Sequence, residues 1–155
     1  MDGRRWRIEG GFGLDRLTAS AVTIGDPAPG RCAVELRAWS LNFRDLLMAR
    51  GQYDPRLALP YVPLSDAVGV VVAVGDGVTR VAVGDRVCPT FSPGWLAGPP
   101  TVDATRVTRG GPIPGVLSTC VDLDAGELVH PPAHLTDVEA ATLPCAGVTA
   151  WHAVV

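Results

Sequence analysis

Apolar and polar positions alternate along much of this chain, as they do in strands with one face in a core. The alternation is clearest from Cys32 to Ser40, and similar patterns predict strands over 4–9 and 17–24. A valine-rich run from Ala67 to Val74 predicts a buried strand, in which Gly69 leaves room for another element to approach closely. Further strands are predicted over residues 86–90, 117–123 and 127–129.

Glycine and proline separate these segments. Residues Gly10–Gly13 predict a hairpin loop, and turns are expected at Gly75–Gly77 and Val83–Asp85. Residues 92–114 form a long excursion with several Gly and Pro, which is unusual in a compact domain unless the segment is functional or mobile.

Short helices complete the predicted fold. Asn42 is suited to cap a helix that runs through Met48. Residues Thr136–Glu139 match the capping box, so a second helix should begin there. Pro144 should interrupt or end that helix. Residues 145–155 then predict a last helix, apolar nearly all round, buried between layers or against a partner.

Composition supports a turn-rich, mainly β fold of one domain, because the 155 residues include 18 Gly and 14 Pro. The net charge is -3 and the 13 basic residues, all Arg, are scattered, which argues against nucleic-acid binding. The apolar runs are too short to cross a membrane, and the polar start lacks a signal core. A cytoplasmic location is therefore expected.

Cysteine and histidine spacing gives no metal motif. The four Cys lie far apart without a C-x-x-C pair, so free thiols that act as small buried hydrophobes are expected. His130 and His134 have i, i+4 spacing, but Pro131 and Pro132 lie between them and prevent an established helix. These two histidines are not expected to bind zinc.

Four short motifs follow one another along the chain: Leu41–Leu46, Pro63–Gly69, Val74–Val78 and Val83–Val87. Together they resemble the N-terminal catalytic domain of the medium-chain dehydrogenase/reductase superfamily, whose fold is similar to the GroES co-chaperonin. The resemblance continues through Leu143–Trp151. It implies a GroES-like, partly open β-barrel with short helices.

The same resemblance implies a domain organisation. Residues 1–135 would form the GroES-like substrate domain, and residues 136–155 a helical linker toward a Rossmann-type nucleotide-binding domain. No glycine-rich phosphate loop of the G-x-G-x-x-G type occurs in the chain, so that domain is expected to be missing here.

Zinc-dependent members of this superfamily carry a Cys at the start of the first motif and a His-Glu pair in the second. Here Asn42 stands at the first place, and Ser65 and Asp66 stand at the second. These residues lack the thiolate and imidazole of that zinc site. The chain therefore resembles the zinc-independent branch, which contains the quinone oxidoreductases and their alcohol-dehydrogenase-like relatives.

The resemblance also implies site residues. Asn42, Asp45 and Tyr53 would be catalytic, and Asn42 and Thr149 would contact the cofactor. Each has a simpler explanation that stays open: Asn42 as a helix N-cap, Arg44 and Asp45 as a solvated pair, Tyr53 as a half-buried packing residue, and Thr149 as an ordinary helix residue.

The function implied is the substrate side of a zinc-independent oxidoreductase that acts on a carbonyl, alcohol, enone or quinone. NADPH is the expected cofactor, with NADH as the alternative, and no zinc is expected. Without its cofactor domain the chain is expected to be inactive alone. An apolar last helix would favour homo-oligomers. A non-catalytic GroES-like binding or assembly module, or a decayed remnant, stays open as the alternative.

Overall fold

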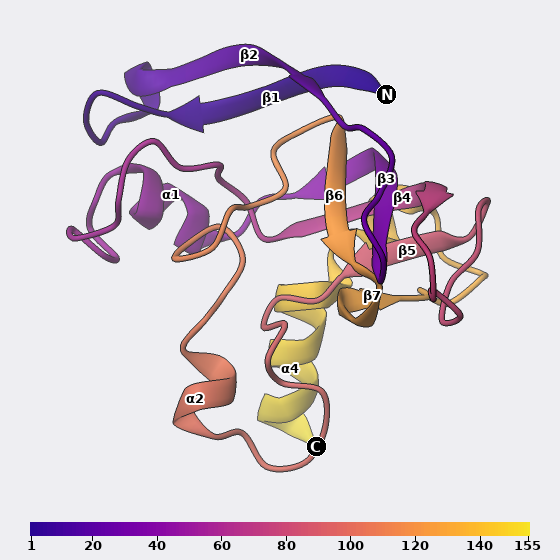
Figure 1. Cartoon of the computed structure of the whole chain (residues 1–155). Helices are drawn as coiled ribbons and strands as arrows, with labels where there is room; N and C mark the ends of the chain where they lie inside the picture. The colour runs from indigo at the N-terminus through magenta and orange to yellow at the C-terminus, as the bar shows by residue number, and fades with distance from the viewer.

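A curved five-stranded sheet forms the centre of the computed structural model, which describes residues 1–155 (Figure 1). Neighbouring strands are antiparallel, in the order β6-β3-β4-β5-β7. Their bounds are β3 Arg31–Ser40, β4 Asp66–Val74, β5 Arg86–Pro89, β6 Cys120–Asp124 and β7 Leu128–Val129. The mainly β, GroES-like fold predicted from the sequence, a partly open barrel with short helices, is confirmed.

The β3–β4 pair bends the sheet and carries much of its core. Its register shifts between Ala33 and Val34 and again between Leu36 and Ala38, and such irregularities increase strand curvature. At Gly69 on β4, a Cβ atom would lie 2.3 Å from the carbonyl oxygen of Glu35 on β3. The close approach predicted at this glycine is therefore confirmed. Fully buried side chains of the main apolar cluster include Val34, Val71, Val87, Val116 and Leu128.

A separate hairpin covers one end of the sheet. It consists of β1 (Asp2–Ile8) and β2 (Leu17–Thr23), joined by a glycine-rich loop and the 3-10 turn η1 (Leu14–Arg16). Isolated bridges from Arg5 to Ser118 and from Ile8 to Tyr61 connect the hairpin to the rest of the chain. The predicted hairpin loop is thus confirmed.

The helical segments are short. They are α1 (Phe43–Ala49), α2 (Val102–Thr105), η2 (Ala125–Glu127), α3 (Asp137–Ala140), η3 (Leu143–Gly147) and α4 (Val148–Val154). The capping box at Thr136 is present, since its hydroxyl accepts from the Glu139 N–H at 3.3 Å. None of these helices reaches the length and apolarity that a bilayer crossing requires.

The last helix differs from the sequence prediction. Residues 143–147 form a π-helical turn, in which the N–H of Gly147 bonds to the carbonyl of Thr142, and α4 begins only at Val148. Pro144 has no N–H and favours such irregular geometry at the start of the helix. Along α4, Trp151 and Val154 are exposed. Of the two alternatives expected for this helix, burial between layers of this chain is not found, and burial against a partner stays a prediction.

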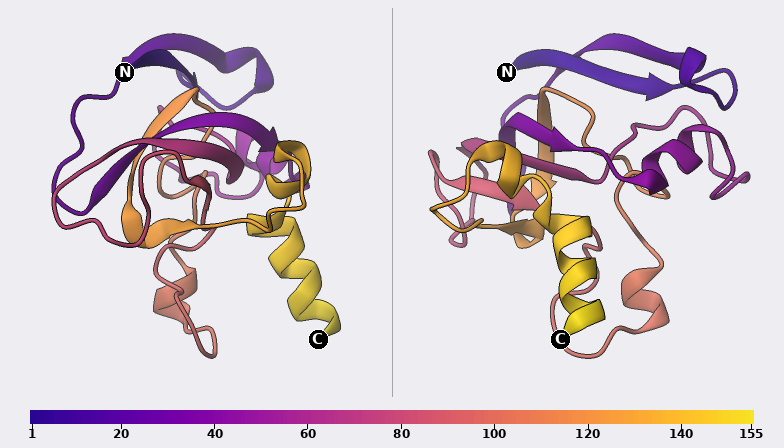
Figure 2. Two further views of the ribbon diagram at one scale, coloured as in Figure 1. Left: turned by 90° about the vertical axis from the view of Figure 1, so that its right-hand side faces the viewer. Right: turned by 180° about the vertical axis from the view of Figure 1, so that it is seen from behind.

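The hairpin and the last helix lie on opposite sides of the central sheet (Figures 1 and 2). The β1–β2 hairpin lies at one end of the molecule, and α2 and α4 project from the opposite end (Figures 1 and 2). The segment between β5 and β6, which contains α2, runs beside α4. This is the long excursion of the sequence, and it forms a wall next to the last helix.

Candidate functional site

Asp66 is the centre of a buried polar cluster, which we define as Asn42, Ser65, Asp66 and the backbone of Cys145. Asp66 is completely buried at the start of β4. Its Oδ2 accepts from Nδ2 of Asn42 at 3.1 Å and from the N–H of Cys145 at 3.1 Å. Its Oδ1 accepts from the Ser65 hydroxyl at 2.9 Å. The Asp66 cluster therefore joins three segments that are far apart in the sequence.

Burial raises the pKa of Asp66 above its ordinary value. Hydrogen bonds from Asn42, Ser65 and the backbone of Cys145 and Ala146 oppose this rise by stabilising the carboxylate. Every partner donates a hydrogen bond and none accepts one. The ionised side chain, which can only accept, matches these surroundings.

Asn42 and Asp45 meet at the start of α1. Asn42 occupies the N-cap position, and the Asp45 carboxylate accepts from the Asn42 N–H at 2.8 Å. Asp45 is 6% exposed, and its burial raises the pKa of its carboxyl group. Asn42 thus has both the capping position and a place in the Asp66 cluster, two roles that one residue can combine.

Arg44 lies between two aromatic rings. Its guanidinium carbon is 5.1 Å from the ring centroid of Tyr53 and 5.2 Å from that of Phe91. Its Nη2 donates to the Thr108 hydroxyl at 2.9 Å and to the carbonyl of Gly111 at 2.6 Å. Arg44 therefore fastens the end of the long excursion to α1.

This arrangement corrects one alternative from the sequence. Arg44 and Asp45 do not form a solvated pair, because Asp45 is buried and Arg44 bonds to the loop instead. Tyr53 is 58% exposed, so it is more open than the half-buried packing residue that the other alternative described.

Thr149 lies in the first turn of α4 and lines a cavity of about 800 Å³ between α4 and the excursion, which we call the helix cavity. Its other lining residues include Phe91, Trp95, Cys145, Val148 and His152. The rings of Trp95 and His152 lie 5.2 Å apart and tilted by 32°. The cavity combines apolar walls with a few hydroxyl groups and one thiol, a composition typical of ligand sites.

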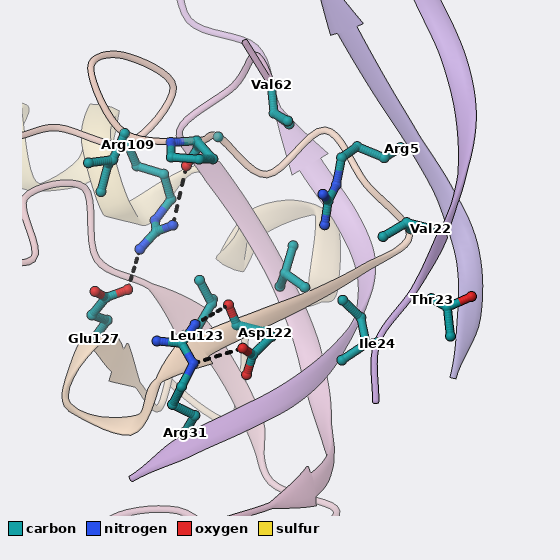
Figure 3. Close-up of a pocket in the computed structure, with 14 residues that line it drawn as sticks. Arg5, Val22, Thr23, Ile24, Arg31, Val62, Arg109, Asp122, Leu123 and Glu127 are labelled. Atoms are coloured by element: carbon teal, nitrogen blue, oxygen red, sulfur yellow. Dashed lines mark hydrogen bonds and ion pairs between the residues drawn. The ribbon is translucent and has the colours of Figure 1, made fainter. Parts of the chain in front are cut away.

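A second cavity, of about 470 Å³, lies between the β1–β2 hairpin and the sheet, and we call it the hairpin cavity (Figure 3). Two ion pairs lie along its wall. The buried Arg109 donates to Glu127, and Arg31 donates to the Asp122 carboxylate at 2.7 Å. Because these charges already satisfy one another, the hairpin cavity offers little chemistry.

The structure brings some of the predicted site residues together and leaves others apart. Asn42 and Asp45 are in direct contact. The ring of Tyr53 contacts the guanidinium group of Arg44, the residue that precedes Asp45 in the chain. Thr149 is connected to Asn42 only indirectly, through Asp66 and the backbone of Cys145. Thr149 alone among them lines the helix cavity.

Sequence reasoning missed two members of the site. It placed Cys145 among the buried hydrophobes, whereas Cys145 is partly exposed and lines the helix cavity; the other three cysteines are buried, and all four are free. It gave Asp66 no role. A carboxylate at the beginning of an otherwise apolar strand was the available signal, since a buried charge needs partners.

The donor groups of the chain do not form a metal site. No group of three or more His, Cys, Asp or Glu side chains is arranged to hold a metal ion. Nε2 of His130 lies 3.0 Å from the carboxylate of the turn residue Asp85, so this pair supplies at most two ligands. Asn42 and Ser65 supply an amide and a hydroxyl where catalytic zinc sites use thiolate, imidazole or carboxylate.

Comparison with known proteins gives consistent matches. The family model described as alcohol dehydrogenase GroES-like domain matches residues 28–133. A zinc-type alcohol dehydrogenase-like protein of Schizosaccharomyces pombe is 44% identical over 141 residues, which cover 90% of this chain and 41% of that protein.

Solved structures match in the same way. A candidate alcohol dehydrogenase of Sinorhizobium meliloti 1021 superposes with a TM-score of 0.89 and 43% identity over 99% of this chain and 46% of its own. An NAD-dependent alcohol dehydrogenase gives a TM-score of 0.79 and 28% identity over 96% of this chain and 45% of its own. The chain spans less than half the length of each of these three proteins.

Proposed function

Because this chain belongs to the alcohol dehydrogenase GroES-like domain family, we propose that it forms the substrate side of a zinc-independent, nicotinamide-dependent oxidoreductase. The substrate would carry a carbonyl, alcohol, enone or quinone group. NADPH is the proposed cofactor and NADH the alternative. Reduction of such a group needs a hydride, which the nicotinamide supplies when bound, and hydrogen-bond donors near the substrate oxygen.

The observation that carries this proposal is the position of the Asp66 cluster beside the helix cavity. Asp66 bonds both to Asn42 at the start of α1 and to Cys145, whose side chain lines the cavity. The walls of this cavity are largely apolar, and polar interactions are stronger where a bound ligand excludes water. A satisfied polar cluster at the edge of an apolar cavity is typical of a catalytic pocket.

Zinc does not fit the residues present. The amide of Asn42 and the hydroxyl of Ser65 both donate to Asp66, so these two side chains are directed toward a carboxylate. Asp66 in turn is occupied by hydrogen bonds from the protein, and no three His, Cys, Asp or Glu side chains are arranged to hold a metal ion. The proposed reaction therefore has no step at a metal ion, although one relative is named zinc-type.

The proposal gives two hydroxyl groups a role in the chemistry. Tyr53 is exposed, and the guanidinium group of Arg44 stacks on its ring, which keeps a positive charge close to the site. Its hydroxyl would donate to the substrate oxygen as negative charge develops. The Thr149 hydroxyl, in the wall of the helix cavity, would contact the nicotinamide.

The test supplies the cofactor-binding part. We would join this chain to the remainder of the Sinorhizobium meliloti 1021 protein and follow NADPH oxidation with a quinone and with an aldehyde, before and after treatment with a metal chelator. We expect turnover that the chelator leaves unchanged. Tyr53→Phe should lower kcat/KM by about 100-fold, since it removes one oxyanion donor.

The chain offers a matched control in its second tyrosine. The Tyr61 hydroxyl is buried and has no hydrogen-bond partner, so Tyr61→Phe should leave kcat/KM within about twofold of the parent. Loss of activity on chelation would contradict zinc independence. A folded hybrid without NADPH binding or turnover would contradict the oxidoreductase proposal itself.

A further inference from the structure

Asp66 touches three segments of the candidate site at once. It stands at the start of β4, its carboxylate accepts from the Asn42 side chain at the start of α1, and it accepts from the backbone of η3 through Cys145. No other side chain of the Asp66 cluster contacts all three segments. Its removal would separate the start of α1 from the helix that carries Thr149.

The N–H of Cys145 needs an acceptor from outside its own helix. The first N–H groups of any helix lack a partner within that helix. Here Pro144 supplies no N–H at all, and the first bond of the π-turn comes from Gly147 to Thr142. The Asp66 carboxylate, 79 residues earlier, therefore supplies the missing acceptor at 3.1 Å.

The same carboxylate fixes the orientation of the Asn42 amide. Its Nδ2 donates to Asp66 at 3.1 Å and is 3.4 Å from the Ser65 hydroxyl oxygen. An amide held in this way directs its NH2 group to Asp66 and Ser65. Donation to the substrate oxygen is then left to other groups, such as the Tyr53 hydroxyl.

We propose that Asp66 is the positioning residue of this site, which acts as an ionised carboxylate and holds the Asn42 amide and the start of η3 in one fixed arrangement. Residues that keep a site in a productive geometry commonly stand one contact away from the reacting atoms. The link to nicotinamide binding rests on the proposed function, whereas the positioning itself does not.

Hydrogen exchange in the 15N-labelled 155-residue chain tests the positioning directly. In Asp66→Asn, the amide of Cys145 should exchange at least about tenfold faster, which is the loss of about 1.4 kcal/mol of protection, because an Asn side chain holds this N–H and the Asn42 NH2 less well than a carboxylate. Asp45→Asn is the matched control. It changes the other buried aspartate, which does not contact Cys145, and should leave this exchange rate unchanged.

The unmodified chain provides a second measurement, which does not depend on a variant that folds. If one carboxylate holds both groups, the side-chain NH2 signal of Asn42 and the amide signal of Cys145 should shift with the same pH midpoint. That midpoint should persist in Asp45→Asn, which lacks the nearby buried carboxyl. Different midpoints, or equal acceleration of Cys145 exchange in both variants, would overturn the proposal.

The hybrid enzyme adds a functional measurement. There Asp66→Asn should raise KM for NADPH by about tenfold or more, and Asp66→Glu, which restores the charge, should recover part of this loss. If the unsubstituted hybrid fails to turn over, the proposed oxidoreductase function fails. The exchange and titration results on the 155-residue chain would still decide the role of Asp66.

Discussion

Two neighbouring regions of this molecule bury charge in different ways. At the hairpin cavity, the buried Arg109 is paired with Glu127, and Arg31 is paired with Asp122. At the α1 side, Asp45 and Asp66 are buried as well, but neither forms an ion pair, and the groups that bond to them are neutral donors.

This difference bears on which of the two regions could bind a ligand. An ion pair within a wall satisfies both charges and leaves little for a ligand. Buried carboxylates held only by neutral donors keep raised pKa values, as Asp45 and Asp66 do through desolvation. Such groups concentrate at functional sites. Asp66 bonds to Cys145, which lines the apolar helix cavity, whereas the ion pairs line the hairpin cavity.

The largest expected effect on stability comes from breaking the buried ion pair. Arg109→Leu leaves Glu127 and the carbonyls of Thr90 and Pro114 without their donor. We expect the free energy of unfolding to fall by about 3–5 kcal/mol, measured by urea denaturation. Arg31→Leu, at a half-exposed pair, should cost no more than about 1 kcal/mol. Equal losses would remove the distinction between the two pairs.

An intermediate effect is expected from Asp45→Asn, and it depends on pH. Desolvation raises the pKa of Asp45 in the folded chain above that of the unfolded chain, whose aspartates titrate near pH 4. Between these two pKa values the folded chain holds a proton that the unfolded chain has lost. Its stability therefore falls as the pH rises through this window.

Asp45→Asn removes this titration. Relative to the unsubstituted chain, the variant should gain stability as the pH rises from about 4 toward 7. Urea denaturation at several pH values measures the difference. Asp54→Asn, at a partly exposed turn residue that accepts from the N–H of Arg56, is the control for replacing an aspartate that is not buried. A difference that shrinks toward neutral pH would contradict the sign of the shift.

The smallest effect on stability should come from chemical labelling of the Cys145 thiol in the helix cavity. Cys145 is partly exposed there, whereas burial raises the pKa of the Cys88 thiol to about 12 and also raises that of Cys32. Iodoacetamide should label Cys145 first in the folded chain, as detected by peptide mass spectrometry. The rate should increase with pH, because desolvation raises the pKa of Cys145 as well.

Cys145→Ser provides the control for this labelling and should abolish the fast phase while the chain stays folded. In the unfolded chain all four cysteines should react. Rapid modification of Cys32, Cys88 or Cys120 in the folded chain would show that the core around the sheet is as open to small molecules as the helix cavity.

The sequence predicted the strands and the first helices closely. The alternation from Cys32 to Ser40 became β3, and the valine-rich run from Ala67 became β4. The capping box at Thr136 began α3 as expected. These elements depend on local periodicity, on turn residues and on capping chemistry, all of which neighbouring residues specify. The start of the last helix was predicted less well. Pro144 lies in a π-helical turn over residues 143–147, and α4 begins only after that turn.

The sequence by itself therefore determined the family and most of the strands, and it named Asn42, Asp45, Tyr53 and Thr149 as candidate site residues. Only the tertiary structure decided that Asp66 bonds to Cys145 across 79 residues, that Arg44 lies between Tyr53 and Phe91, and that Asp45 is buried. The physical reason is that partners and burial arise from segments distant in the chain. A side chain's type specifies what it can bond to, whereas folding determines which groups come within reach.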